Sequence, residues 1–343
     1  MHMADALISP AVGGTLWAAT AGLIGYSSRK VQQDMDDRRI PLMGVLGAFT
    51  FAAQMINFTI PGTGSSGHLG GGMILAILLG APGAFLTLAS VLTVQALFFA
   101  DGGLLALGCN IFNLGFFPCF AAYPLIYKQI VKDNVSERRI AIAATLSAVL
   151  GLQLGALAVV LETYVSGISD LPVATFLLMM QPIHLAIGIV EGLVTAAVVV
   201  FVWKAKPEIL EMNAASKPAA TASFKKVLAG VIMATVVTGG LMSWFASTQP
   251  DGLEWSLSKS TGKEELQAPK RSLYERLAAL QEKTSFLPDY GFKGTKKEEA
   301  GEGWPAVDPG TSLSGLLGGS LTLIALVLLG VLLKRKRKSH VTH

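Results

Sequence analysis

The chain has 343 residues, of which 52% are hydrophobic and only 15% are charged, and its mean hydropathy is +0.54. Because soluble domains carry roughly 25% charged residues, this composition excludes an ordinary water-soluble protein and favours a protein embedded in a lipid bilayer. The net charge of +4 does not indicate nucleic-acid binding, since the basic residues cluster at the ends of apolar runs, as the cytoplasmic anchors of membrane helices do.

The apolar runs of the first 206 residues predict membrane-spanning helices separated by short polar connections. A helix needs roughly 20 apolar residues to cross a hydrocarbon core about 30 Å thick. We expect such spans at about 10–26, 41–58, 105–127, 140–161 and 176–203. The predicted connections include a glycine- and serine-rich loop at 60–68, a turn at 101–103 and an outer loop at 162–172.

The stretch 69–100 is interrupted by Ala-Pro-Gly, so it is either one kinked helix or a short helix followed by a full one. Three basic clusters are expected in the cytoplasm, at 29–39, 128–139 and 204–206. An even number of crossings must separate the first two clusters, and two passes within 69–100 give that parity. The sequence therefore predicts seven helices with the amino terminus and His68 outside. The short pass near 70–80 is either a crossing or a half-helix buried among its neighbours.

The composition becomes more polar after residue 206, which predicts a linker and a separate accessory region. We place a membrane domain at 1–206, the linker at 207–222 and the accessory region at 223–343. Within the accessory region, spans at about 227–245 and 313–333 flank a polar outer segment at 248–311, and the basic run 334–338 places the carboxyl terminus in the cytoplasm. The expected fold is all-α and integral to the membrane, a seven-helix bundle plus two C-terminal transmembrane helices flanking an extracytoplasmic loop.

The amino terminus reads Met1-His2-Met3 and lacks the basic segment that begins a signal peptide, so we expect it to be retained. The α-amino nitrogen, the amide nitrogen of His2 and the His2 imidazole can close fused five- and six-membered chelate rings on one divalent metal ion. Planar nitrogen coordination suits Ni²⁺ or Cu²⁺, with Co²⁺ weaker. His68 is the candidate fourth ligand, because it lies on the same predicted side in a loop whose glycines permit close approach.

The histidine at position two and the glycine-rich loop around His68 also have simpler explanations. A histidine at the second position occurs by chance, and a glycine-rich loop also serves as a flexible connection. Asn110 and Asn113 share a helix face, and they either surround the metal or bond adjacent helices; Gln95 has the same two explanations. His184 and Glu191 also share a face. A glutamate within a membrane helix suggests function, but an interhelical contact explains it equally well.

Other sequence features concern packing and the exclusion of enzyme classes. Gly188 and Gly192 form a GxxxG pair, which is typical of closely packed helices. Cys109 and Cys119 lie in apolar surroundings and are expected to be buried rather than bridged. The chain has no GxxxxGK[ST], HExxH or GxSxG motif, so it is not expected to hydrolyse ATP or to act as a membrane hydrolase.

Several segments resemble the CbiM/NikM family, the substrate-capture (S) subunits of cobalt/nickel energy-coupling-factor (ECF) transporters. The resembling segments are the amino terminus at 1–10, the loop Gly-His-Leu-Gly-Gly at 67–71, the asparagine-rich motif at 108–115 and the motif at 184–192. Together they cover about 1–206. The remainder is similar to the small CbiN/NikN-like accessory subunit of these transporters, fused here, with a PDGLE-type motif at 250–254.

The resemblance implies four nitrogen ligands: the Met1 amine, the His2 amide, the His2 imidazole and the His68 imidazole. It implies a T/Q-type transmembrane coupling subunit and cytoplasmic A/O-type ATPases as partners, together with the lipid bilayer of the cell (inner) membrane. The chain itself is then a transport subunit and not an enzyme, with Ni²⁺ or Co²⁺ as its transported substrate and no organic cofactor. The family often has methionine at the position of Leu114, so the surroundings of the ligands differ slightly here.

We therefore expect a membrane component that captures Ni²⁺ or Co²⁺ at the outer face, with uptake driven by partner ATPases. Planar four-nitrogen coordination favours nickel. The alternative is a membrane metal sensor or scaffold that binds metal without transporting it.

Overall fold

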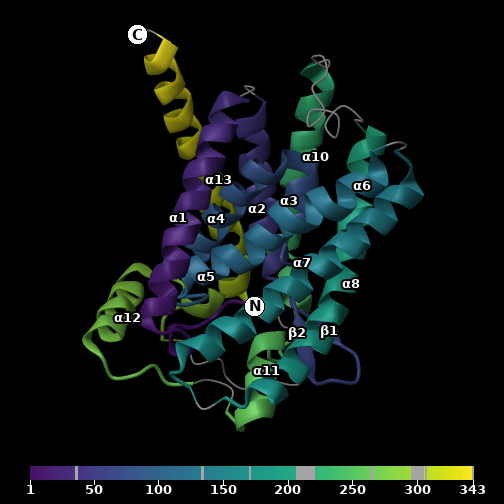
Figure 1. The fold of residues 1–343 in the computed structure, drawn as a ribbon. Coiled ribbons are helices and arrows are strands. Elements are labelled where there is room, and N and C mark those ends of the chain that lie inside the picture. Colours follow the sequence, from purple (N-terminus) through teal and green to yellow (C-terminus); the bar gives the residue numbers. More distant parts are fainter. Residues whose placement is uncertain are drawn as a thin grey trace.

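The computed structural model describes residues 1–34, 38–132, 135–169, 171–205, 221–263, 266–294, 305 and 307–341. The chain forms an almost entirely helical bundle whose long helices run between two ends (Figure 1). Within the described residues, five helical stretches are long and apolar enough to cross a membrane: 81–98, 107–131, 137–166, 173–205 and 309–335. The protein is thus a multi-pass membrane protein, as its composition predicted. Most of the predicted linker, 207–220, lies outside the described residues.

The first two helices are joined to the rest of the bundle by a hairpin. Helix α1 (Pro10–Gln33) begins at Ser9, whose side chain accepts a hydrogen bond from the Val12 amide, and helix α2 is Arg39–Gln54. The loop predicted at 60–68 is largely an antiparallel hairpin of β1 (Phe58–Ile60) and β2 (Ser65–Gly67), in which Phe58 pairs with Gly67. The segment is therefore a paired hairpin and not an irregular loop, and β2 places the residue before His68 opposite Phe58.

The ambiguous stretch 69–100 is two helices. Helix α3 (Gly72–Leu79) and helix α4 (Ala81–Phe98) are separated by Gly80, whose φ of +76° is in the left-handed region that favours glycine. At 1.5 Å per residue, α3 is only about 12 Å long, so it cannot cross a membrane by itself. All of its residues are buried, which identifies it as the half-helix enclosed by its neighbours.

The next segments form the side of the bundle that faces α3. Helix α5 (Leu107–Ile111) continues into the π-helix η2 (Phe112–Tyr127), which contains Pro118 and Pro124, and then into α6 (Lys128–Val131). Proline clashes with the carbonyl four residues earlier in an α-helix, which favours departure from α geometry here. Helices α7 (Glu137–Ser166) and α8 (Val173–Ala205) follow. The outer loop predicted at 162–172 is shorter, because α7 continues to Ser166.

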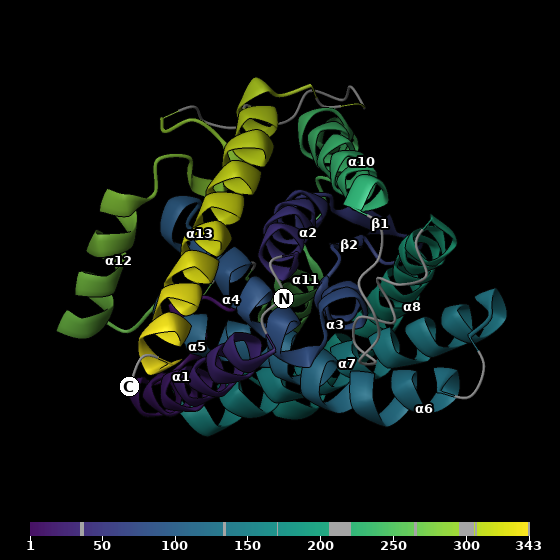
Figure 2. The ribbon, with the colours of Figure 1, turned by 90° about the horizontal axis from the view of Figure 1, so that it is seen from above.

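The accessory region adds two helices and a folded outer segment. Helices α10 (Thr221–Gly240) and α13 (Pro309–Val341) both pack on α2 (Figure 2). The predicted polar segment between them is not an extended loop. It contains α11 (Gly252–Thr261), α12 (Ser272–Thr284) and η5 (Pro288–Tyr290). The 3-10 helix η4 (Met242–Phe245) precedes this segment, at the end of the span predicted at 227–245.

The two ends of the bundle carry different elements. The amino terminus, the β1–β2 hairpin, α11 and α12 lie at one end, whereas α6, the C-terminal end of α1, the start of α2 and the C-terminal end of α13 lie at the other (Figure 1). The elements that carry the predicted cytoplasmic basic clusters therefore meet at one end. Because α3 is too short to cross a membrane, the count of seven membrane helices drawn from charge parity stays a prediction.

The GxxxG pair lies where α7 and α8 touch. A Cβ atom on Gly192 would collide with the Cα of Thr145, and one on Gly188 would lie 2.9 Å from the Cα of Val149. Both glycines thus allow direct contact between the two helix backbones, as the sequence predicted.

Replacing Gly192 by leucine should destabilise the bundle by about 1–3 kcal/mol, since the obstacle is backbone and cannot move aside. The measurement is thermal unfolding of the detergent-solubilised protein. Gly230→Leu is the matched control, because no atom lies within 4 Å of a Cβ at this position on α10. An equal change in both variants would contradict the proposed contact.

Candidate metal centre

The amino terminus is inserted into the bundle rather than free in solvent. Met1 is 4% exposed and Met3 is fully buried. The backbone of Met3 is held from both sides by Asn110, whose carbonyl accepts from the Met3 amide at 2.8 Å and whose amide donates to the Met3 carbonyl at 3.2 Å. The Gly103 amide also donates to this carbonyl, at 2.9 Å. Asn110 thus fixes how far the terminus reaches.

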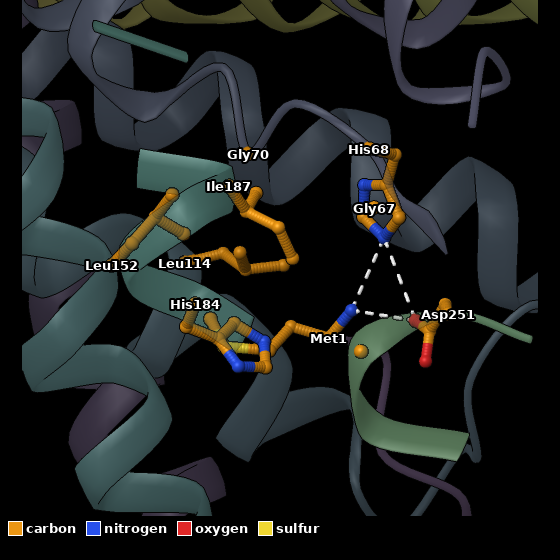
Figure 3. A pocket seen from close by; sticks show the side chains of 10 residues that line it. Met1, Gly67, His68, Gly70, Leu114, Leu152, His184, Ile187 and Asp251 are labelled. Carbon is orange, nitrogen blue, oxygen red and sulfur yellow. Dashed lines mark hydrogen bonds and ion pairs between the residues drawn. The ribbon is translucent and has the colours of Figure 1, made fainter. Parts of the chain in front are cut away.

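The Met1 amine lies between His68 and Asp251 (Figure 3). Its nitrogen is 3.1 Å from His68 Nε2 and 3.0 Å from Asp251 Oδ2. His68 Nδ1 lies 3.1 Å from the carbonyl oxygen of Leu69, and because a carbonyl can only accept, Nδ1 carries the ring proton. The lone pair of Nε2 therefore faces the amine, in the tautomer that binds a metal ion.

The electrostatics of the site keep His68 neutral and Asp251 charged. Burial, and next the Met1 ammonium, lower the pKa of His68 from 6.5 to about 3. Burial raises the pKa of Asp251, but the Met1 ammonium, His68 and the hydrogen bonds to this carboxylate together outweigh burial, so its pKa lies below the usual value. A neutral imidazole is the form that coordinates metals.

His2 completes the cluster but does not yet present a closed chelate. Its ring stacks on the His68 ring with centroids 5.0 Å apart, and its Nδ1 lies 2.7 Å from Asp101 Oδ1. Only Nδ1 can close a six-membered ring with the His2 amide nitrogen, so the imidazole must turn away from Asp101 to bind a metal with the amine. His2 Nε2 is buried without a hydrogen-bond partner in the described part of the chain.

Asp101 links His2 to the accessory region. Its Oδ2 accepts a hydrogen bond from the Tyr290 hydroxyl at 2.5 Å. Burial raises the pKa of Asp101, but the charge of His2 and the hydrogen bonds from His2 and Tyr290 outweigh burial and lower this pKa to about 2. Asp101 lies in the predicted turn at 101–103. The acidic side chain of Asp101 lies on the same predicted side of the membrane as the two histidines, and this position could have identified Asp101 as a residue of the site.

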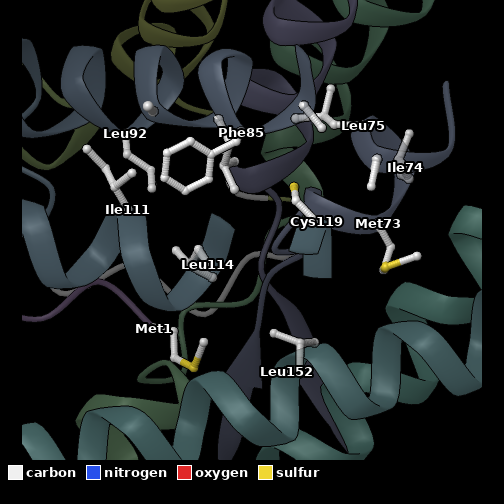
Figure 4. Packing of buried hydrophobic residues seen from close by; sticks show 14 of the residues in the cluster. Met1, Met73, Ile74, Leu75, Phe85, Leu92, Ile111, Leu114, Cys119 and Leu152 are labelled. Atoms are coloured by element: carbon white, nitrogen blue, oxygen red, sulfur yellow. The ribbon is translucent and has the colours of Figure 1, made fainter. Parts of the chain in front are cut away.

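A small cavity extends from the amine into the bundle. It is lined by residues of the amino terminus, the His68 loop, α7, α8 and the PDGLE-type motif, among them Met1, His68, Leu152, His184 and Asp251 (Figure 3). The Met1 side chain itself belongs to the buried hydrophobic cluster that includes Met73, Leu114 and Leu152 (Figure 4). Apolar packing of Met1 thus holds its amine at the edge of the cavity.

The polar residues within the membrane helices hold the His68 loop. Glu191 Oε2 accepts from the Gly70 amide at 2.8 Å, and Gln54 Nε2 donates to the Gly70 carbonyl at 2.8 Å. Gln95 Nε2 in turn donates to Gln54 Oε1 at 2.9 Å. Glu191 therefore bonds directly to the loop that carries His68, whereas Gln95 bonds the adjacent helix α2 through Gln54, as the structural explanation predicted.

The other polar residues singled out from the sequence lie around the same end of the bundle. His184 is 1% exposed, and its Nδ1 lies 2.8 Å from the Met180 carbonyl. Asn113 donates to Glu162 Oε2 at 2.8 Å, so it bonds adjacent helices, whereas Asn110 holds the terminus. Cys109 and Cys119 are buried free thiols, as predicted.

Sequence reasoning missed the role of Asp251, which it treated only as part of a family motif. Asp251 begins α11 in a capping box: its Oδ1 accepts from the amides of Leu253 and Glu254, and Glu254 Oε2 accepts from the Asp251 amide. The sequence feature that could have revealed the start of α11 is an aspartate followed three residues later by a glutamate, a pattern typical of the first turn of a helix.

The rest of this motif docks on the elements beside His68. The Pro250 carbonyl accepts from the Ser66 amide on β2 at 2.8 Å. Gly252 packs so closely on α8 that a Cβ would lie 2.5 Å from Ile183 and 3.2 Å from His184. Leu253 is buried in the same cluster. The motif thus places Asp251 between the hairpin and α8.

A metal centre at this place depends on the main chain. Within the described residues, no three His, Cys, Asp or Glu side chains gather into a group that could hold a metal ion. The chelate predicted from the sequence differs from such a group, because it would use the terminal amine and a backbone nitrogen beside the two imidazoles.

Comparisons with known proteins agree with this architecture. Residues 2–209 match the family described as the cobalt uptake substrate-specific transmembrane region, and residues 225–335 match the PDGLE domain. The chain is 31% identical over 325 residues to a putative fused nickel transport protein NikMN of Archaeoglobus fulgidus, covering 94% of this chain and 96% of that protein. It is 35% identical over 212 residues to a putative metal transport protein of Haloquadratum walsbyi, covering 61% and 93%.

A solved structure shares the fold of the membrane domain. The crystal structure of a truncated transition metal transporter superposes with a TM-score of 0.53 at 28% sequence identity. The match covers 60% of this chain and 99% of that structure.

Replacing Asn110 by alanine should free the amino terminus, because the substitution removes both hydrogen bonds to Met3. At about 1 kcal/mol for each bond, the detached population should rise roughly 30-fold. The measurement is the rate at which an aminopeptidase trims the purified protein. Gln153→Ala is the control, since Gln153 also makes a side chain–backbone bond, to the Gln181 carbonyl. Equal trimming of the two variants would refute the role of Asn110.

Proposed function

Because the chain belongs to the family described as the cobalt uptake substrate-specific transmembrane region, we propose that it is the substrate-binding membrane component of an ECF-type importer for Ni²⁺ or Co²⁺. The single observation that best supports this proposal is the 3.1 Å distance between the Met1 amine and His68 Nε2, which brings together two ligands 67 residues apart. In this proposal the end of the bundle that carries the amino terminus faces outward and the carboxyl terminus is cytoplasmic.

The chemistry of capture follows from the donors. The proposed ligands are the Met1 amine, the His2 amide nitrogen, His2 Nδ1 and His68 Nε2. The ammonium and the amide must each lose one proton to bind, so affinity should rise with pH. Four nitrogen donors in a plane favour Ni²⁺ over Co²⁺.

The proposal also assigns different roles to the two regions of the chain. Residues 1–206 capture the metal and 223–343 form the accessory region that covers the site. ATP hydrolysis is assigned to partner subunits, which drive reorientation of the bundle and inward release.

Helix α1 offers a surface for a coupling subunit in the membrane. Its outward face carries small exposed residues, namely Ala11, Gly14, Ala18, Gly22 and Gly25. A Cβ atom on any of these three glycines would meet no atom within 4 Å. In a bilayer, a face of small residues lets a second helix approach closely, and this feature supports a transmembrane partner.

Extending the amino terminus by one residue should abolish metal uptake by cells, because the displaced amine no longer lies beside His68. The measurement is cellular Ni²⁺ uptake, since an extended terminus can still chelate Ni²⁺ through its amine, two amide nitrogens and the His2 imidazole without His68. Extending the carboxyl terminus by one residue is the control. Unchanged uptake by the amino-terminal variant would contradict the proposed chelate.

Replacing Ala18 by tryptophan should break coupling while leaving metal binding intact, because the indole prevents close approach of a partner helix far from the site. Metal uptake by cells and co-purification of partner subunits should fall together. Ala197→Trp on α8 is the matched control, since Ala197 is also exposed on a membrane helix. Normal uptake by the Ala18 variant would argue against α1 as the docking face.

A further inference from the structure

One carboxylate oxygen of the accessory region lies against two of the proposed ligands. Asp251 Oδ2 is 3.0 Å from the Met1 nitrogen and 3.8 Å from His68 Nε2. These two nitrogens are themselves 3.1 Å apart, so the three atoms form one compact triangle (Figure 3). A metal ion bound by both nitrogens would lie within reach of Oδ2.

The two oxygens of Asp251 have separate tasks. Oδ1 accepts from the Leu253 and Glu254 amides at 2.8 and 2.9 Å and starts α11. Oδ2 is directed to Met1 and His68. Capping a helix needs only one side-chain oxygen, so the helix start alone does not explain the placement of the second.

Asp251 is held rigidly in this position. Pro250 before it is bonded to β2, and Gly252 after it packs directly on Ile183 and His184 of α8. Its side chain is 17% exposed. The carboxylate is therefore a fixed part of the site and not a mobile surface group.

The charge of a loaded site requires such a group. A divalent ion bound to one deprotonated amide, one amine and two neutral imidazoles leaves a net charge of +1. An uncompensated charge in a buried, apolar cavity is costly, and one carboxylate neutralises it. In the structure the positive partner of Oδ2 is the Met1 ammonium.

We infer that Asp251 is a metal-site residue supplied by the accessory region, whose Oδ2 neutralises the captured Ni²⁺ or Co²⁺ and approaches it beside the Met1 amine and His68. The inference rests on the proposed function. It makes the site composite: the membrane domain supplies the nitrogen ligands and the accessory region supplies the balancing oxygen. Tyr290 adds a second contact from the accessory region, through Asp101 to His2.

The test is the affinity of the full-length solubilised protein for Ni²⁺ and Co²⁺, measured with Asp251→Asn and Asp251→Ser. Asparagine and serine are as good helix caps as aspartate, so both variants keep the start of α11. Asparagine removes the charge, and serine removes the charge together with the atom in the place of Oδ2. Affinity should fall roughly 10- to 100-fold, the usual effect of losing a group that supports metal ligands. The visible absorption of the bound Ni²⁺ should also shift.

Glu275→Gln is the matched control, because it also removes one negative charge from the accessory region, at an exposed position on α12. It should bind both metals as the unaltered protein does. His68→Ala should lose binding if the proposed function is right. If His68→Ala loses binding and the two Asp251 variants bind as tightly as the unaltered protein, or more tightly, this inference is overturned and the proposed function stands. If His68→Ala binds normally, the proposed function fails first.

Discussion

The contacts of the buried Met1 ammonium with Asp251 and His68 are the interactions on which the rest of this site depends. A charge inside an apolar bundle is costly unless it is paired, and here the amine is held between His68 and Asp251. The amine reaches that place because the Met1 and Met3 side chains are buried and because Asn110 holds the Met3 backbone. Three distant parts of the chain must therefore converge on its first residue.

The half-helix α3 makes this convergence possible. Since α3 begins only at Gly72, the loop before it lies inside the bundle, where unpaired backbone groups are costly. Glu191 and Gln54 satisfy the amide and the carbonyl of Gly70, and this arrangement turns His68 toward the amine. Polar residues in membrane helices thus serve the site without touching it.

The accessory region belongs to the same structural unit as the membrane domain. Helix α13 packs on α2, and the PDGLE-type motif is bonded to the β1–β2 hairpin and packed against α8. The fusion of the two regions in one chain keeps Asp251 and Tyr290 next to the amino terminus. The PDGLE-type motif, the β1–β2 hairpin and the amino terminus therefore form one contiguous structure at this end of the bundle.

The sequence by itself determined the features that depend on neighbours along the chain or on composition. Apolar runs predicted membrane helices, and basic clusters predicted which elements lie together at one end of the bundle. The Met1 amine is adjacent to His2 because the two residues are covalently linked. The hydropathy pattern could not show that the outer segment folds into α11 and α12, because helices outside the membrane leave no long apolar run. Only the tertiary structure brought Asp251 within 3.0 Å of an amine 250 residues away, turned His2 toward Asp101 and selected the His68 tautomer. These details depend on packing between distant segments, which no local pattern encodes.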